Sequence, residues 1–260
     1  MRTRDQYIES LRDGREVYYR GERVADVTQH PELGLAVRHA AIDYEMAHDP
    51  AWKHLAVEGE GSAAYSSYFK LPKSSKDLLH RSELIEAATT LGGTLVVLVK
   101  EIGTDALFAL HLVAQEMDAK RGTQYLDRVR RFHEHVKSGD LAMAVAQTDA
   151  KGDRSKGPLE QEHPDYYLRI VGETAEGIIV RGAKVHTSVS INSNELIVLP
   201  TRALKQDESA YAVAFAIPMN TEGLKLITSP YGAHHDDSNF DAPLASKHRM
   251  METLTVFDDV

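Results

Sequence analysis

The sequence predicts an α+β protein, in which an N-terminal all-α helical domain over residues 1–140 precedes an antiparallel β-barrel over residues 141–260. Up to residue 140, apolar side chains recur three and four residues apart, a spacing typical of buried helix faces. Beyond residue 150, the chain changes to short runs rich in β-branched and aromatic residues, separated by turns such as TAEG and MNTEG. This change of pattern predicts two units of different class within one chain.

Short elements are predicted near the N-terminus. Thr3 and Gln6 fit a capping box, which starts a short helix. The segment EVYYRGERV, residues 16–24, predicts a small hairpin that turns at Arg20–Gly21. Pro31 then opens a helical stretch. The hairpin is the one β element expected in the first unit.

Longer helices are predicted between residues 75 and 140. From Ser75 the pattern is helical, and residues 82–100 are rich in Ala and Leu. The next helix is expected to end at Gly122, and a further one near Gly139. The buried face of the helix before Gly122 is expected to consist of Ile102, Ala106, Leu107, Leu110, Val113, Ala114 and Met117.

Six strands are predicted in the second half, and this number suggests an antiparallel barrel or sandwich. The runs are YYLRIV, GIIVRGAKVHTSV, ELIVLPT, YAVAFAIP, LKLIT and ETLTVF.

Composition narrows the class of function. The 260 residues include 30 basic and 39 acidic ones, a formal net charge of −9, which disfavours nucleic acid and anionic membranes as partners. The absence of cysteine excludes disulfides and thiolate-held iron–sulfur clusters within this chain. The longest apolar run, LVVLV, is far shorter than the roughly 20 residues that span a bilayer. The simplest interpretation is a soluble cytoplasmic protein with no membrane partner.

The first candidate site is the segment TDAKGDRSKGP, residues 148–158, between the helical and the β-rich halves. Its glycines permit close approach of backbone N–H groups to a ligand. Arg154 offers a planar fork suited to phosphate or carboxylate, and Lys151 and Lys156 add positive charge. The spacing fits neither a Walker loop nor a dinucleotide fingerprint. Two interpretations stay open, an anion-binding loop and a solvated linker.

The second candidate site is RGAKVHTSVSINSNE, residues 181–195, a strand-like run of small hydrogen-bonding residues. Since strand side chains alternate between faces, His186, Ser188 and Ser190 are expected to point the same way. Such a face suits a polar heteroaromatic ligand. The alternative is an exposed edge strand that leads into a turn.

The histidines do not predict a metal site. His133 and His135 are two residues apart on a predicted helix, so they face different directions. The run His234, His235, Asp236 and Asp237 is expected to be a solvated loop rather than a metal-binding one.

Long segments then resemble one known family. The segments are RTRDQYIESLRDGREVYYRGERVADVTQHP, TDAKGDRSK, DYYLRIVGETAEGIIVRGAKVHTSVSINSNE and VFDDV. They are similar to the 4-hydroxyphenylacetate 3-hydroxylase family of flavin-dependent proteins, which also contains 4-hydroxybutyryl-CoA dehydratase. The resemblance covers nearly the whole chain. It implies a helical domain, a middle β-barrel and a C-terminal helical bundle, with FAD between them and usually a homotetramer.

Flavin contacts are implied residue by residue by this resemblance. One group follows the first domain and a second lies in the strand-like run. The implied FAD-binding residues are Gln147, Thr148, Lys151, Gly152, Asp153, Arg154, His186, Thr187 and Ser188. His186 is the titratable ring among them that could act as acid or base, and it is the candidate catalytic residue.

The chain also departs from the family pattern. The hydroxylases have an Arg and a Tyr where this sequence has Ile102 and Ala106, and a His where it has Val145. The dehydratase has two cluster-binding Cys where this sequence has Val97 and Glu101. These departures argue against ordinary phenol hydroxylation and against an iron–sulfur cluster.

The resemblance implies a flavin-dependent monooxygenase-type oxidoreductase that uses reduced FAD and O₂ on a small organic substrate. A partner flavin reductase would supply the reduced FAD. The family's C-terminal helical bundle is absent from this chain, so two interpretations stay open, a fragment of a longer protein and one half of a split protein with a separate helical-bundle chain as partner. A homo-oligomer is also expected. Two alternatives stay open, an acyl-CoA dehydratase or isomerase without the cluster, and a non-catalytic flavin-binding half of a split protein.

Overall fold

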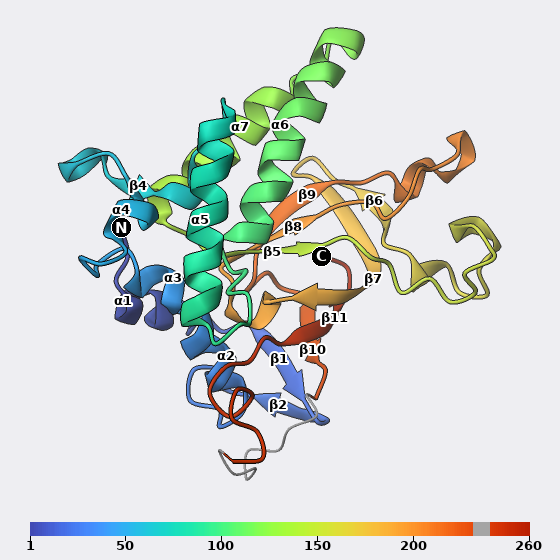
Figure 1. Cartoon of the computed structure of the whole chain (residues 1–260). Helices are drawn as coiled ribbons and strands as arrows, with labels where there is room; N and C mark the ends of the chain where they lie inside the picture. Colours follow the sequence, from blue (N-terminus) through green and yellow to red (C-terminus); the bar gives the residue numbers. More distant parts are fainter. Residues whose placement is uncertain (231–239) are drawn as a thin grey trace.

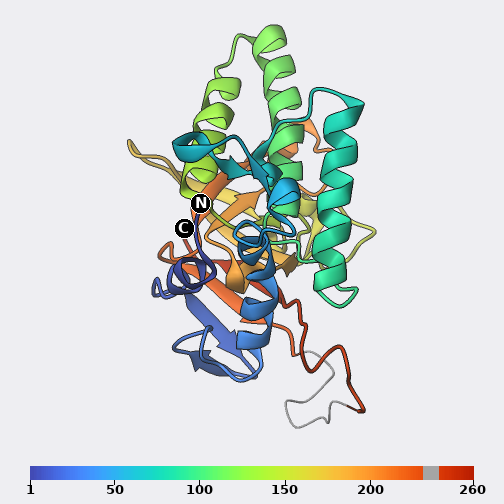
Figure 2. The same ribbon diagram turned by 60° about the vertical axis from the view of Figure 1, so that its left-hand side comes forward.

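The computed structural model describes residues 1–230 and 240–260. Figures 1 and 2 show two long helices, residues 101–121 and 125–139, that project together at one end of the molecule, and a third, residues 75–91, that runs alongside the strands. The α-helices are α1 (Arg4–Glu9), α2 (Leu33–Ala40), α3 (Ile42–Glu45), α4 (Lys53–Ala56), α5 (Ser75–Leu91), α6 (Glu101–Arg121) and α7 (Tyr125–Gly139).

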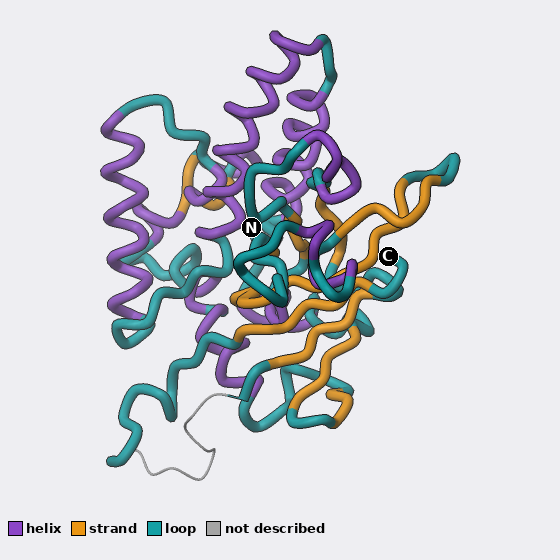
Figure 3. The backbone as a smooth tube through the Cα atoms, turned by 90° about the vertical axis from the view of Figure 1, so that its right-hand side faces the viewer, coloured by secondary structure: helices purple, strands orange, loops and turns teal. Residues whose placement is uncertain are grey.

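The strands form two main sheets and one small one. The larger sheet has the order β2-β1-β10-β11-β7-β6, a second has the order β5-β8-β9, and β3 pairs with β4. The strands are β1 (Glu16–Tyr19), β2 (Glu22–Val24), β3 (Val57–Glu58), β4 (Tyr65–Ser66), β5 (Met143–Ala146), β6 (Arg169–Glu173), β7 (Ile178–Ser188), β8 (Glu195–Val198), β9 (Phe215–Pro218), β10 (Leu224–Thr228) and β11 (Glu252–Phe257). Figure 3 shows the strands gathered on one side and the long helices on the other.

The prediction of an all-α N-terminal domain is wrong. The hairpin β1–β2 is present, with Arg20 and Gly21 at φ 53° and 86°, but it does not stand alone. β1 pairs in parallel with β10, so that Glu16 lies opposite Lys225. The physical reason is that β1 buries Val17 and Tyr19 and needs backbone partners on both edges. The division of the chain at residue 140 stays a prediction.

The prediction of an antiparallel β-barrel is also wrong. The described residues form open sheets, in which β2 and β6 are the two edges of the larger one. All six predicted strands exist, but β1 and the unpredicted β5 add parallel pairs with β10 and β8. Because β1 and β2 come from the predicted helical unit, the larger sheet is assembled from both predicted units, whereas the sheet that contains β5 lies wholly beyond residue 140.

Local signals at the helix ends are confirmed. The Thr3 hydroxyl accepts from the Gln6 backbone N–H, as a capping box requires. Gly122 ends α6 in the left-handed region at φ 67°.

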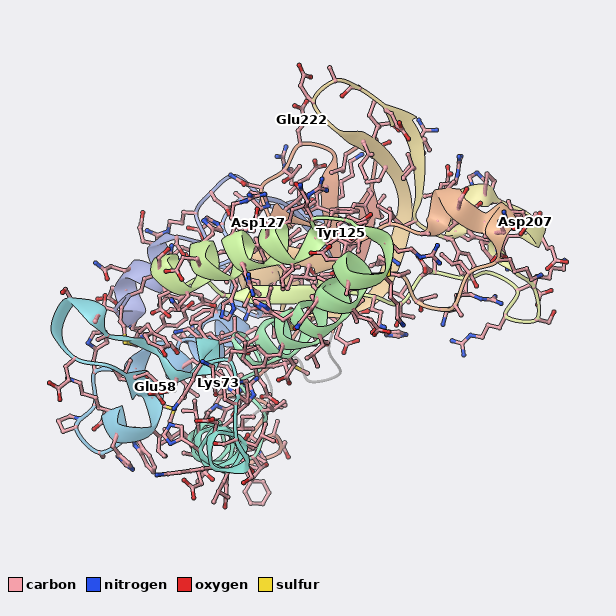
Figure 4. All side chains as sticks on the ribbon, turned by 90° about the horizontal axis from the view of Figure 1, so that it is seen from above. Glu58, Lys73, Tyr125, Asp127, Asp207 and Glu222 are labelled. Carbon is pink, nitrogen blue, oxygen red and sulfur yellow. The ribbon has the colours of Figure 1, made fainter. Side chains whose placement is uncertain are left out.

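The expected buried face of α6 continues only to Ala114, and Val113 is 55% exposed. The far end of α6 and the start of α7 project beyond the sheets, and Figure 4 labels Tyr125 and Asp127 there.

Two further predictions concern the run from His234 to Asp237 and the absence of membrane-spanning segments. His234, His235, Asp236 and Asp237 lie outside the described residues. Across residues 1–230 and 240–260, no helix is long and apolar enough to cross a membrane. The cytoplasmic location stays a prediction.

Candidate functional site

The two stretches singled out in the sequence are hydrogen-bonded to each other. The Val185 backbone N–H donates to the Thr148 carbonyl at 2.8 Å, and the Ala150 N–H donates to the Ala183 carbonyl at 3.1 Å. Asp149 and Lys184 face each other between these bonds as an antiparallel bridge. The segment after β5 therefore acts as a short extra strand along β7. It brings Thr148, Asp149 and Ala150 alongside residues 183–185, which directly precede His186.

A buried ion pair fastens this junction, and the sequence analysis missed it. Lys184 Nζ lies 2.7 Å from Asp149 Oδ1, with both side chains at most 5% exposed. Lys184 also donates to the carbonyls of Gln147 and Leu199, each at 3.0 Å. Burial lowers the pKa of Lys184, and the Asp149 carboxylate opposes this shift. The signal in the sequence was a lysine between two apolar residues, Ala183 and Val185, but only strand pairing shows that Lys184 meets Asp149.

The loop that follows is folded against itself. Lys151 and Gly152 have φ of 68° and 53°, and the Lys151 N–H donates to the Tyr166 carbonyl. A Cβ at Gly152 would lie 2.5 Å from the Tyr166 ring, so glycine is required for this packing. Gln161 accepts from the Asp153 N–H at 3.0 Å and donates to its carbonyl at 2.8 Å. The loop conformation is thus set by internal contacts.

The outer face of this loop presents polar groups to solvent. Gln147, Gly152, Asp153 and Arg154 are exposed. Hydrogen bonding from Ser155 lowers the pKa of Asp153, which keeps that carboxyl charged. Over residues 1–230 and 240–260, the Arg154 guanidinium takes part in no ion pair and no hydrogen bond. Its fork is therefore available to an anion.

His186 sits at an irregularity in β7. Its φ is 56°, and the pairing of β7 with β11 shifts between Thr253 and Thr255. This bulge disrupts the expected alternation. His186 is exposed and Ser188 is partly buried, but Ser190 is fully buried and donates to the Thr187 carbonyl. The prediction that His186, Ser188 and Ser190 share one face is therefore wrong for Ser190.

Glu252 on β11 joins this group and was not predicted. Its Oε1 accepts from Ser188 Oγ at 3.0 Å, and its Oε2 lies 3.3 Å from His186 Nδ1. Between these two residues, the buried Thr187 Oγ1 has no hydrogen-bond partner among the described residues. The candidate residues thus include the free guanidinium fork of Arg154 and, around His186, a group of hydrogen-bonding side chains. Such a donor set fits a ligand with an anionic group and a polar ring.

The start of α6 carries a second polar cluster. Lys100 Nζ donates to Asp140 Oδ1 at 2.6 Å, and both side chains are buried. Burial raises the pKa of Asp43 to about 7, and the positive charge of Lys100 opposes that shift. Burial also raises the pKa of Glu101. These groups connect α3, α6 and the end of α7.

The histidines and carboxylates of these regions make contacts with protein groups. The described part of the chain contains no group of three or more His, Cys, Asp or Glu side chains placed to bind a metal ion. His133 instead accepts at Nδ1 from His111 Nε2 at 3.0 Å and donates from Nε2 to the Phe69 carbonyl at 2.8 Å. These contacts join α6 and α7.

Comparison with known proteins points to one family. A family model described as 4-hydroxyphenylacetate 3-hydroxylase N terminal matches residues 3–260. The chain is 35% identical over 268 residues to the 4-hydroxybutyryl-CoA dehydratase/vinylacetyl-CoA-Delta-isomerase of Clostridium aminobutyricum, covering 99% of this chain and 54% of that protein. It is 30% identical over 262 residues to the 4-hydroxyphenylacetate 3-monooxygenase oxygenase component of Thermus thermophilus, covering 100% of this chain and 53% of that protein.

Two solved structures share the fold. A 4-hydroxybutyryl-CoA dehydratase from N. maritimus superposes with a TM-score of 0.92 at 32% identity, covering 100% of this chain and 52% of that one. A 4-hydroxyphenylacetate 3-monooxygenase oxygenase component complexed with FAD superposes with a TM-score of 0.85 at 29% identity, covering 100% and 53%. The chain therefore spans about half the length of the relatives that it matches.

Proposed function

Because this chain belongs to the 4-hydroxyphenylacetate 3-hydroxylase family, we propose that it forms the flavin-binding N-terminal part of a flavin-dependent monooxygenase-type oxidoreductase. The enzyme would use reduced FAD and O₂ on a small organic substrate. The proposed FAD-binding residues are Gln147, Thr148, Lys151, Gly152, Asp153, Arg154, His186, Thr187 and Ser188.

The observation that supports this proposal most strongly is the pairing of the two stretches. Residues 148–150 and 183–185 are joined by backbone hydrogen bonds and by the buried Lys184–Asp149 pair. One ligand can therefore touch both. The FAD complex of a structural neighbour shows that this fold can hold the cofactor.

The residues fit distinct parts of a flavin nucleotide. The free fork of Arg154 suits the diphosphate, and Lys151 adds positive charge beside it. Thr148 and Ser188 offer hydroxyl groups to the polar ring or the ribityl chain. When bound, reduced FAD supplies the electrons that activate O₂ for transfer to substrate. The protein orients the cofactor and excludes water, and His186 Nε2 is placed to hold or move a proton.

The substrate is expected to differ from 4-hydroxyphenylacetate. Ile102 packs against the main hydrophobic core, while Ala106 and Val145 pack in a smaller cluster that includes Leu107. None of these three side chains can hydrogen-bond a phenol or transfer a proton.

We propose a flavin reductase as partner, and we propose that the protein assembles into a homo-oligomer. A C-terminal helical bundle would be supplied by a separate chain or by further residues of the same protein.

An anaerobic titration of reduced FAD into the purified protein tests this function. We expect saturable binding that weakens at least tenfold in Arg154→Ala, because a charged hydrogen bond to phosphate is lost. Arg23→Ala on β2 is the matched control, since Arg23 is also exposed and lies on the opposite edge of the sheet. Equal loss in both variants, or no binding by a folded protein supplied with its helical-bundle partner, would contradict the proposal.

A second function is favoured by the 35% identity to the dehydratase and the TM-score of 0.92. In this case the chain would belong to a flavin-dependent acyl-CoA dehydratase or isomerase without an iron–sulfur cluster, because the sequence contains no cysteine. A measurement of oxygen consumption distinguishes the monooxygenase from the dehydratase or isomerase. A monooxygenase consumes O₂ with its substrate, whereas a dehydratase or isomerase converts an acyl-CoA without consuming O₂.

A further inference from the structure

We propose that Glu252 is a positioning residue of the candidate flavin site, which turns His186 Nε2 and Ser188 Oγ into a pair of hydrogen-bond acceptors. This inference rests on the proposed function of that face. With this arrangement, His186 and Ser188 would bind hydrogen-bond donors of the flavin, such as the imide N–H of the ring or the ribityl hydroxyls.

The contacts of Glu252 divide evenly between two neighbours. Glu252 lies directly opposite Ser188 in the β11–β7 register. One carboxylate oxygen accepts from the Ser188 hydroxyl at 3.0 Å, and the other lies 3.3 Å from His186 Nδ1. Each oxygen therefore fixes one side chain of the proposed flavin contacts.

The backbone supports a directed role for His186. A non-glycine residue at φ 56° inside a strand is unusual, because its Cβ is crowded in the left-handed region. The bulge leaves Thr187 paired with Thr253, while His186 turns outward. Bulges beside functional sites commonly redirect one side chain. Here the redirected ring meets a carboxylate on the neighbouring strand.

The chemistry of the carboxylate determines which ring nitrogen carries the proton. An ionised carboxylate can only accept, so the hydrogen bond requires N–H at Nδ1 of His186. In the neutral ring, Nε2 then has a lone pair, and it meets no partner within the described residues. The hydroxyl proton of Ser188 is also used by Glu252, so that Oγ offers lone pairs. Both groups consequently present acceptors to a ligand.

The direct test is the tautomer of His186 in the ligand-free protein. Long-range ¹H–¹⁵N correlation of the imidazoles at pH 8.5, with His186→Gln to assign the signal, is expected to show the Nδ1–H tautomer. In Glu252→Ala the signal should shift towards Nε2–H, and Glu252→Gln, which keeps a carbonyl acceptor, should retain Nδ1–H. The matched control is Glu222→Gln, an exposed glutamate in the turn before β10 that Figure 4 labels. Nε2–H in the unmodified protein, or no change in Glu252→Ala, would overturn the proposal.

A second readout links the tautomer to the flavin. Affinity for reduced FAD should fall about three- to tenfold in Glu252→Ala and stay close to normal in Glu252→Gln, with unfolding midpoints measured alongside. Unchanged FAD affinity in a Glu252→Ala protein whose tautomer has shifted would overturn the link to flavin. If the tautomer responds as expected but the unmodified protein binds no FAD, the proposed function fails while the role of Glu252 in fixing His186 stands.

Discussion

At the scale of single residues, buried charges hold the candidate site together. Lys184 makes contacts with Asp149 and with the carbonyls of Gln147 and Leu199 in a nearly dry environment. Asp149 is also bound by the Leu168 N–H at 3.0 Å. Removing one partner of such a pair leaves the other charge buried without compensation.

Lys184→Met is expected to lower the free energy of unfolding by about 3–5 kcal/mol, because the Asp149 carboxylate loses its counter-charge. Denaturant unfolding measures this change. Lys156→Met is the control, since Lys156 is half exposed and should cost at most about 1 kcal/mol. Adding Asp149→Leu to Lys184→Met should recover much of the stability, and no recovery would argue against an unpaired charge as the cause.

Asp43→Asn is expected to raise the free energy of unfolding, and the increase should be larger at high pH than at low pH. Burial raises the Asp43 pKa from 3.8 to about 7, so the folded protein retains a proton that the unfolded chain releases near pH 4. Stability is therefore lost as pH rises from about 4 to 7, and the loss is constant above that range. The Asn variant should gain roughly 2–4 kcal/mol at pH 8 and little at pH 4.

Unfolding free energies at several pH values check this expectation. Asp207→Asn serves as the control, because Asp207, labelled in Figure 4, is exposed in the short 3-10 helix Gln206–Tyr211. A gain in Asp43→Asn that does not vary with pH would show that removal of the buried charge is not responsible.

The candidate residues could be chosen from the sequence, but their supporting residues could not. Arg154 and His186 stand out by residue type, whereas Lys184 and Glu252 matter because of strand pairing. Glu252 is 66 positions from His186 in the chain, and a bulge sets their final register. Local sequence signals a hairpin between neighbouring strands, but it does not show which strands far apart in the chain will lie next to each other.

At the scale of elements, the loop between β5 and β6 is pre-shaped by its own contacts. Gly152 packs against Tyr166 in a left-handed conformation, and Gln161 links the backbone of Asp153 to the far side of the loop. A pre-shaped loop loses less conformational entropy on binding than a flexible one. This element is therefore suited to binding an anion through Arg154.

Gly152→Ala is expected to cost about 1–3 kcal/mol of stability and to weaken binding of reduced FAD, because the new Cβ clashes with Tyr166 and disfavours φ 53°. Unfolding midpoints and flavin titrations measure both effects. Gly177→Ala is the control, since a Cβ there meets nothing within 4 Å. Normal flavin affinity in Gly152→Ala would show that the loop shape is not needed for binding.

Helices and strands differed in how well the sequence predicted them. Caps at Thr3 and Gly122 depend on contacts within a few residues, and both were predicted. β5, with the sequence MAVA, lacks β-branched and aromatic enrichment, and it forms a strand because β8 pairs along it. Its assignment therefore depends on a partner 52 residues away.

At the scale of the whole molecule, the two halves of the chain share one sheet. β1 lies between β2 and β10, although more than 200 residues separate Tyr19 from Leu224. The sequence predicted the hairpin but assigned it to a separate helical domain. Parallel pairing has no local turn signal, so this error follows from long-range topology.

Amide hydrogen exchange checks this shared sheet. The amides of β1 should exchange about as slowly as those of β10, because both strands lie inside the six-stranded sheet. Fast exchange of β1 with slow exchange of β10 would mean that the hairpin opens independently. Val17→Ala, which removes two methyl groups from a fully buried side chain, should accelerate exchange in both strands together.

The central claim is that two segments from different parts of the chain form one flavin-binding face. Peptide-resolved hydrogen exchange with and without reduced FAD, under anaerobic conditions, tests it most directly. We predict slower exchange on binding in residues 147–154 and in residues 186–188 together, with little change in β1 or β2. Protection of only one of these segments, or protection confined to other parts of the molecule, would contradict the claim.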